Sequence, residues 1–397
     1  MTLSHTDLRD GELMELNMGP QHPSTHGVLR LLLELDGEIV RECRPDIGYL
    51  HTGFEKSFED HTYQQCIPFT DRMDYLAPLV NNLGFALAVE RLLGIEVPPR
   101  AQYLRVILGE LTRLASHLIF YGSHAMDLGA TTAFFNAWRD REKLLDINEV
   151  ISGVRMHTSF IRIGGLMADV PDEFFAMAHE VVETFPRLID EHEELITRNP
   201  IFVDRTRGIG VLDVGAALSY GCSGPSLRAS GVPWDLRKAK PYSSYDHFDF
   251  DVPIGRYGDV YDRYLVRMEE MRQSISIIDQ ALRKLPRGPV TTADRKVAPP
   301  PRNELNTSME SLIHHFKLVT EGFRPPAGAV YEAVESPRGE LGFYLVSDGS
   351  NRPYRCKVRA PSFSNLAALP YVVRGALLAD VVGIIGSFDY LMGDVDR

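Results

Sequence analysis

The stretch DRMDYLAPLVNNLGFALAVERLLGIEVPPRAQYLRVILGELTRLASHLIFY, residues 71–121, is typical of two long helices joined by a short turn. Asp71 can cap the first helix, which we expect to end near Leu93. Pro98-Pro99 opens the second helix, about Ala101 to Tyr121, because proline is tolerated in a first helical turn. The apolar residues at helical spacing in the first helix are Leu76, Leu79, Val80, Leu83 and Leu87.

Three more long helices are predicted further along the chain, at about Phe134 to Ile151, Pro171 to Arg198 and Gly258 to Leu285. We expect a bend at Pro186, because proline interrupts helical hydrogen bonding. The irregular stretch 208–253 separates the last two helices. Long helices of this kind favour a central bundle.

Both ends of the chain are predicted to contain strands. Val28 to Leu35 and Glu38 to Cys43 flank the hairpin signal Asp36-Gly37. Leu341 to Val346 and Tyr354 to Val358 read as a second hairpin around residues 348–349.

Between the bundle and the second hairpin, a further helix is expected after the capping box Thr307 to Glu310, with Gly322 as its C-cap. A last apolar helix is expected at about Leu377 to Phe388. The predicted class is therefore α+β. Residues 1–70 form a β-rich region, residues 71–290 a helical bundle and residues 291–397 an α+β region, and we expect the three to make one compact unit.

Composition excludes several functions. The net charge of −12 and the pI near 5.6 disfavour binding to a phosphate backbone. No apolar run approaches the roughly 18 residues that span a bilayer, and Met1 to Glu15 lacks a signal-peptide core. The cysteines form no CxxC pair, so reduced and mostly buried thiols are expected; they are Cys43, Cys66, Cys222 and Cys356.

The loop GPQHPSTHG, residues 19–27, is the strongest local signal, because its prolines and glycines can present a side chain on a rigid base. His22 and His26 have the spacing of a helical metal pair, but Pro23 makes a helix improbable here. Taken alone, a loop histidine is usually solvated.

Three further candidates have ordinary interpretations when judged by spacing alone. Tyr75 fits an amphipathic helix position, Asp127 before Leu128-Gly129 fits a turn or cap, and His157 fits a surface or cap histidine. Gly208-Ile-Gly210 lacks the third glycine of a dinucleotide site, so NADH binding by this chain is unsupported.

Several blocks of this sequence resemble the D subunit of respiratory complex I, the NADH:quinone oxidoreductase. The blocks run in order from about residue 18 to residue 397, so the resemblance covers nearly the whole chain. The matching blocks are residues 19–30, 47–56, 71–75, 155–157, 161–165, 251–255, 308–317, 346–349 and 393–397.

That family is similar to the large subunit of nickel–iron hydrogenases, which hold their metals with two CxxC pairs. The corresponding places here look like Ile47-Gly-Tyr-Leu50 and Leu391-Met-Gly-Asp394, which contain no thiol. Without soft anionic ligands a nickel–iron centre cannot be held. The resemblance therefore implies an inherited hydrogenase-like fold whose former metal cavity accepts a quinone headgroup.

The resemblance also implies roles for single residues. His26 and Tyr75 match the pair that hydrogen-bonds the quinone oxygens and supplies protons, with Ser24, Thr25 and Gly27 in the same loop. Asp127 matches the carboxylate that pairs with that histidine. His157 matches the position beside the terminal iron–sulfur cluster of the small subunit. Thr52 occupies a position that is arginine in some relatives, so cationic tuning of the cluster from that site is absent.

The implied cofactors lie outside this chain: the iron–sulfur cluster, FMN and NADH belong to partner subunits, and quinone is the substrate. The implied partners are the small cluster-bearing subunit, the C subunit of the complex and the membrane subunit of the quinone channel, at the cytoplasmic face of the bacterial inner membrane. The sequence leaves open ubiquinone or menaquinone.

The sequence leaves three alternatives open. The first is a ferredoxin- or F420-fed relative of complex I, which identification of co-purifying subunits would reveal. The second is an active nickel–iron hydrogenase or a related membrane-bound hydrogenase subunit, which a nickel assay would reveal. The third is an assembly scaffold without a role in catalysis.

Overall fold

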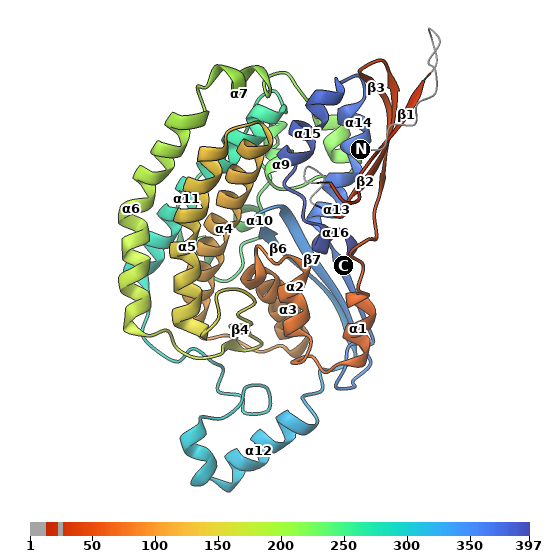
Figure 1. The fold of residues 1–397 in the computed structure, drawn as a ribbon. Coiled ribbons are helices and arrows are strands. Elements are labelled where there is room, and N and C mark those ends of the chain that lie inside the picture. The colour runs from red at the N-terminus through yellow and green to blue at the C-terminus, as the bar shows by residue number, and fades with distance from the viewer. Residues whose placement is uncertain (1–12, 23–26) are drawn as a thin grey trace.

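The computed structural model describes residues 13–22 and 27–397, and it has the α+β architecture expected from the sequence (Figure 1). The predicted long helices are present, and four of them pack against one another as a bundle: α4, α5, α6 and α11. Helix α6 continues through Pro186. The long helices are α3 (Pro78–Leu93), α4 (Pro99–Asp127), α5 (Thr131–Ser152), α6 (Asp172–Ile196) and α11 (Val260–Lys284).

The prediction of one helix from Asp71 to Leu93 is wrong in its first turns. Asp71 is a fully buried residue inside a separate short helix, α2 (Ile67–Met73), and caps nothing. The chain breaks at residues 74–77, and α3 begins only at Pro78. The carboxylate of Asp74 accepts hydrogen bonds from the backbone N–H groups of Leu76 (3.2 Å) and Ala77 (3.1 Å), which turns the chain here.

Two antiparallel sheets lie beside the bundle. The first has the order β1-β2-β3 and contains the predicted hairpin, together with an outer strand that the sequence did not indicate. The second has the order β6-β7-β8 and includes the second predicted hairpin, and α3 packs on β6 and β7. The strands are β1 (Met14–Met18), β2 (Arg30–Asp36), β3 (Ile39–Asp46), β6 (Gly328–Ser336), β7 (Gly339–Ser347) and β8 (Arg355–Arg359), besides the short pair β4 (Ile161–Arg162) and β5 (Gly165–Leu166).

Short helices connect these layers. The helix after the proline linker is capped by Ser308, whose side chain accepts from the N–H of Ser311, and not by Thr307; Gly322 ends it as predicted, with φ +74°. The short elements are α1 (Phe54–Asp60), α7 (Pro200–Asp204), α8 (Val214–Ser219), α9 (Pro225–Ala229), α10 (Leu236–Ala239), η2 (Tyr245–His247), η3 (Arg302–Asn306), α12 (Met309–Thr320), α13 (Pro361–Ala367), α14 (Leu369–Val373), α15 (Leu378–Ser387) and α16 (Met392–Asp396).

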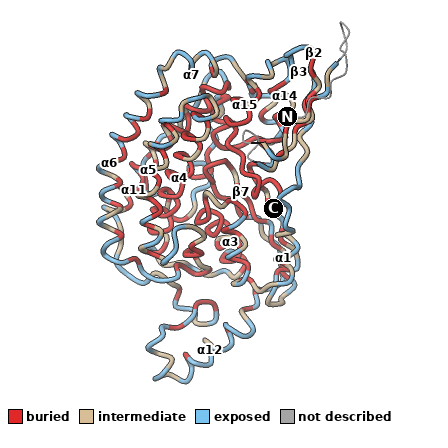
Figure 2. The backbone as a smooth tube through the Cα atoms, in the orientation of Figure 1, coloured by how far each residue is buried: buried red, intermediate tan, exposed pale blue. Residues whose placement is uncertain are grey.

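The buried residues lie between the helix bundle, the two sheets and the C-terminal helices (Figure 2). One apolar cluster fills the bundle and its contact with the second sheet, and another joins the first sheet to the C-terminal helices. Helix α12 projects from the body (Figures 1 and 2). Several of its apolar side chains are exposed, among them Leu312, Phe316 and Val319. All four cysteines are buried and unpaired, as predicted. Within residues 13–22 and 27–397, no helix combines the length and the apolar character needed to cross a bilayer.

Candidate functional site

The loop that carries the strongest local signal is described only at its two ends. His26, Ser24 and Thr25 lie outside the described residues. Gly27, which precedes β2, has a φ of +80°, a conformation that favours glycine, and its N–H donates to the carbonyl oxygen of His22 at 3.2 Å. Fully buried Leu29 follows, so the C-terminal end of the loop is anchored in the first sheet.

Tyr75 lies in the break between α2 and α3, and not inside a helix. The preceding residue, Asp74, is buried and receives two hydrogen bonds from the same guanidinium nitrogen, Nη1 of Arg338, at 2.8 and 3.0 Å. Arg338 also donates to Asp389 (3.4 Å) and to Ser116 (3.2 Å). A buried network of residues from four regions of the chain therefore determines where Tyr75 lies.

The electrostatics of this network favour an ionised Arg338 beside a neutral phenol. Burial alone would lower the pKa of Arg338, but Asp389 and Asp74 outweigh that effect and raise it. Burial raises the pKa of the Tyr75 hydroxyl; Arg338 opposes that shift and Asp74 adds to it. Tyr75 is therefore a protonated donor at neutral pH.

The C-terminal segment packs directly over Tyr75. A Cβ atom on Gly393 would lie 2.6 Å from the carbonyl oxygen of Met73 and 3.4 Å from Cε1 of Tyr75. Asp394 follows, with burial and then Asp74 raising the pKa of its carboxyl to about 6. Its oxygen Oδ2 accepts from the backbone N–H of Ser362 at 3.0 Å. At position 393, only glycine permits the close approach of the C-terminal segment to Met73 and Tyr75.

We therefore predict that Gly393→Ala destabilises the folded chain by about 1–3 kcal/mol, since a backbone oxygen cannot move aside as a flexible side chain can. Gly109→Ala is the matched control, because the nearest atom to its added methyl group would be 3.7 Å away, at an ordinary contact distance. Denaturant unfolding of the two full-length variants measures the difference. Equal stability of the two variants would contradict the close packing of Gly393 on the carbonyl oxygen of Met73.

Asp127 is the last residue of α4, six residues beyond the predicted end of that helix, and it borders the same C-terminal segment. A Cβ atom on Gly386 would lie 3.5 Å from its Oδ2. Burial raises the pKa of the Asp127 carboxyl to about 6. Burial raises the pKa of the Tyr390 hydroxyl, and the negative charge of Asp127 raises it further. Asp127 and Tyr75 thus lie against two places in one segment, residues 386–394.

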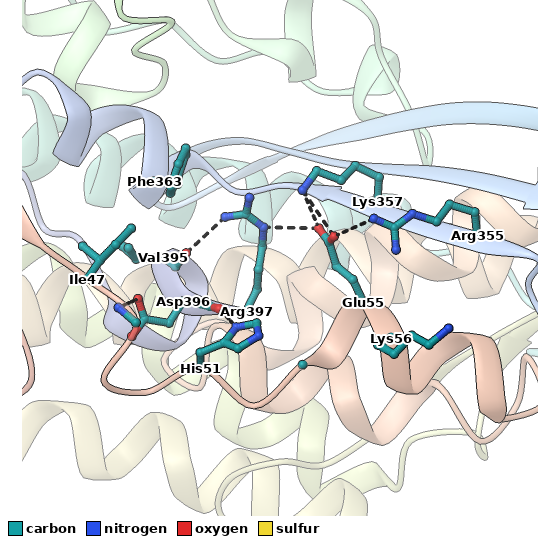
Figure 3. Close-up of a pocket in the computed structure, with 12 residues that line it drawn as sticks. Ile47, His51, Glu55, Lys56, Arg355, Lys357, Phe363, Val395, Asp396 and Arg397 are labelled. Carbon is teal, nitrogen blue, oxygen red and sulfur yellow. Dashed lines mark hydrogen bonds and ion pairs between the residues drawn. The ribbon is translucent and has the colours of Figure 1, made fainter.

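The loop Ile47–Leu50 is hydrogen-bonded to Asp396, two residues beyond that segment. The carboxylate of Asp396 accepts from the backbone N–H groups of Gly48 (2.8 Å) and Leu50 (2.7 Å), and the His51 ring donates to the Asp396 carbonyl oxygen at 2.6 Å. Figure 3 shows Asp396 and His51 facing each other across this junction. Residues 47–51 therefore adjoin the C-terminal end of the described chain.

A pocket of about 420 Å³ opens beside this junction (Figure 3). Glu55 of α1 projects into it and accepts from Lys357 and Arg355 of β8 and from Arg397, so the carboxylate ties the last strand to the tail. Val395 and Phe363 line its other side in the same view. The pocket is distinct from the surroundings of Tyr75.

His157 has a φ of +57° and Ser159 a φ of +44°, which is strained backbone for residues other than glycine. The His157 ring donates from Nδ1 to the carbonyl oxygen of Asp71 at 3.1 Å, and the Ser159 hydroxyl donates to the Asp71 carboxylate. His157 is thereby attached to α2, the helix that leads to Tyr75.

Sequence reasoning missed the buried residues Arg338 and Asp389, and it named Asp394 without giving its side chain a role. No local pattern indicates what these three residues contact, because their partners are far away in the chain. Among the described residues, no group of three or more His, Cys, Asp or Glu side chains could hold a metal ion.

Comparison with known proteins gives consistent matches. Residues 127–397 match the family described as "Respiratory-chain NADH dehydrogenase, 49 Kd subunit". The chain is 56% identical to the D 2 subunit of NADH-quinone oxidoreductase from Chloroflexus aurantiacus, over 97% of this chain and 95% of that protein. It is 55% identical to the D subunit from Geotalea uraniireducens, over 97% and 99%. It is 57% identical to subunit 4 of the same enzyme from Thermus thermophilus, over 97% and 94%.

Proposed function

This chain belongs to the family of the 49 kDa subunit of respiratory-chain NADH dehydrogenase, and from that premise we propose that it forms the quinone headgroup site of its complex. The chain is a subunit of an NADH:quinone oxidoreductase and works with other subunits of that complex. We also propose that the cofactors of the complex sit in other subunits. The observation that carries the proposal is the packing of Tyr75 between a buried ion pair and the C-terminal segment.

Tyr75 is proposed to donate a hydrogen bond to one quinone oxygen and then its proton. Reduction of a quinone to a quinol adds two electrons and two protons, and it makes both oxygens strongly basic. A phenol with a raised pKa is a weak acid towards water, but it can protonate such an oxygen. Its fixed position beside Asp74 and Gly393 supports this role, because proton transfer needs a hydrogen-bond distance.

His26 is proposed to serve the second quinone oxygen, with Ser24, Thr25 and Gly27 shaping the loop that carries it. An imidazole with an ordinary pKa near 6.5 releases a proton readily near neutral pH. Asp127 is proposed to pair with the protonated ring and to take part in the charge change when that proton leaves. Its half-buried position at the end of α4 supports this role, since a buried carboxylate favours a cation beside it.

His157 is proposed to lie beside the terminal iron–sulfur cluster of the small partner subunit and to couple its reduction to proton uptake. Its strained backbone supports a functional role, because such strain is found most often at functional sites. We also propose the C subunit and the membrane quinone-channel subunit as partners, FMN and NADH as cofactors of other subunits, and a peripheral place on the cytoplasmic face of the bacterial inner membrane.

The fold is proposed to be that of the nickel–iron hydrogenase large subunit, with residues 1–70, 71–290 and 291–397 acting as one compact unit. The hydrogen bonds from Gly48 and Leu50 to Asp396 support this, because they join the first of these regions to the last. The ion pair of Arg338 with Asp74 joins the second region to the last.

The role of Asp127 is tested by the pH dependence of quinone reduction in the purified complex. We expect the kcat of the unaltered complex to fall on the acid side, because burial raises the pKa of Asp127 to about 6 and a protonated Asp127 no longer stabilises a cationic His26. Asp127→Asn should lose this acid limb and have a kcat roughly 10- to 100-fold lower at neutral pH.

The matched control is Asp146→Asn, which removes an exposed carboxylate from α5 and should leave the pH profile unchanged. Asp127→Asn should not lose stability at neutral pH. A raised pKa in the folded state means that folding disfavours the ionised carboxyl at a pH above that pKa. Removing the charge therefore does not lower the free energy of unfolding at neutral pH. An acid limb that persists in Asp127→Asn would refute the assignment.

A further inference from the structure

Arg141 of α5 is a buried arginine without a partner among the described residues. The residue is only 7% exposed, and no residue of the described chain accepts a hydrogen bond from its side chain or forms an ion pair with it. Its Nε atom is enclosed and makes no hydrogen bond to any described residue. Burial lowers the pKa of Arg141; Glu142 opposes the shift and Arg155 adds to it. Because an isolated buried charge is costly, native proteins almost always pair one.

The side chain lies in a narrow cleft between the start of α3, the middle of α4 and the second half of α5. Tyr75 and Arg155 line the same cleft. Figure 1 shows α5 at the front of the helix bundle, next to α4, with α2 and α3 beside them. The remaining walls are largely apolar, and they include Leu76, Pro78, Leu144, Leu145 and Met156. We call this place the Arg141 cleft.

No Asp or Glu of the described chain forms an ion pair with Arg141. Glu142 is next in sequence, but its carboxylate pairs with Arg155, and both side chains of that pair are about half exposed. Asp140, on the other side, accepts from Arg139 and binds the ring of His192. The chain has 54 acidic and 42 basic residues, so the missing partner reflects the geometry of the cleft and not a shortage of carboxylates.

The size of the Arg141 cleft limits what can enter it. Its enclosed volume is about 20 Å³, which is enough for one water-sized polar group and too little for an aromatic ring. A quinone headgroup is therefore excluded from its inner end. A carboxylate at the tip of a side chain fits, because its oxygens can reach the guanidinium while its stem lies between the leucines and Met156.

We propose that the Arg141 cleft receives an aspartate or glutamate side chain from a partner subunit, carried on an otherwise apolar segment. The proposal rests on the proposed function only in requiring that this chain works inside a complex. A fully desolvated charge pair surrounded by apolar contacts is typical of an interface hot spot. Because Tyr75 forms one wall of the cleft, docking of the partner also closes one side of the proposed headgroup site.

The test compares Arg141→Met with the control Lys143→Met, which removes the same charge from α5 on the side that faces α6. In the full chain alone, Arg141→Met should raise the midpoint of thermal unfolding, because it removes an unpaired buried charge. In the complex, the same variant should weaken association of this chain with its partner subunits at least tenfold. Lys143→Met should leave both measurements unchanged.

The opposite signs separate docking from a structural role. If Arg141 only supports the fold, Arg141→Met lowers stability in the isolated chain and in the complex alike, and the proposal is wrong. It is also wrong if association is unchanged, or if quinone affinity falls while association does not, since the anion would then be the substrate. None of these outcomes depends on whether Tyr75 and Asp127 act on quinone.

A second measurement identifies the docked group. In a complex carrying Arg141→Lys, a carbodiimide joins the new amine to a carboxylate in contact with it, with loss of water, and mass spectrometry locates the amide bond. We expect a cross-link to an aspartate or glutamate of a partner subunit. A cross-link to an acid of this same chain, or the absence of any cross-link, would overturn the proposal.

Discussion

Tyr75→Phe is expected to lower the kcat of quinone reduction by roughly 10²- to 10⁴-fold, the range that a positioned proton donor contributes. The ring, its packing under Gly393 and the Asp74–Arg338 pair all remain, so the complex should assemble normally. The KM for quinone should rise only a few-fold, because one ground-state hydrogen bond contributes about 1 kcal/mol. The measurement is steady-state quinone reduction by the purified complex.

Tyr344→Phe is the matched control, because it removes a hydroxyl from a partly exposed tyrosine on β7, away from the site. It should leave kcat and KM unchanged. A Tyr75→Phe complex with full activity would remove the phenol from the mechanism, and it would favour the interpretation of this chain as a scaffold. If Tyr75→Phe raises KM and leaves kcat unchanged, Tyr75 binds the quinone but does not donate the proton.

Arg338→Met is expected to destabilise the folded chain by about 3–5 kcal/mol, the cost of breaking a buried ion pair from one side. Asp74 loses both of its hydrogen bonds from the guanidinium, and Asp389 loses its contact with the same group. Three buried acids, Asp74, Asp389 and Asp394, then share one region without this cation. Denaturant unfolding of the full-length variant measures the loss.

The pH dependence of this variant has a definite sign. The pKa of Asp394 is already raised to about 6 by burial and by Asp74, with Arg338 acting to lower it, so removal of Arg338 raises it further. A folded-state pKa above the unfolded value means that the folded chain binds more protons. Arg338→Met should therefore recover part of its stability as the pH is lowered towards 6.

Arg91→Met is the control for this experiment. Arg91 also pairs with a carboxylate, that of Glu332, but its side chain is 57% exposed, so its loss should cost less than about 1 kcal/mol. A double variant, Asp74→Asn with Arg338→Met, should be more stable than Arg338→Met alone, because it removes one uncompensated charge. If Arg338→Met and Arg91→Met unfold at the same denaturant concentration, the network does not stabilise the site.

Local patterns predicted the long helices and two hairpins, but they missed most of the short elements. The hairpin signal Asp36-Gly37 lies between β2 and β3, and Gly322 ends α12, because turn and cap preferences depend on a few adjacent residues. Strands β1 and β6 were missed, since pairing with a neighbouring strand stabilises them as much as their own composition does.

The site was harder to predict than the elements. Tyr75 was identified through resemblance, but its position in a break between two helices depends on Asp74, whose partner Arg338 lies 264 residues away. Spacing along the chain carries no signal for such a contact. The same is true of Asp396, which binds the loop that begins 349 residues earlier, at Ile47.

The sequence by itself determined the α+β class, the long helices, the four lone thiols and the family, because these depend on neighbouring residues or on ordered blocks of residues. Only the tertiary structure decided that α2 and α3 are separate, that Asp127 and Tyr75 lie against one C-terminal segment, and that Arg141 is buried without a partner in the described chain. The physical reason is that burial and ion pairing depend on distances in space, and packing brings together residues that no local pattern relates.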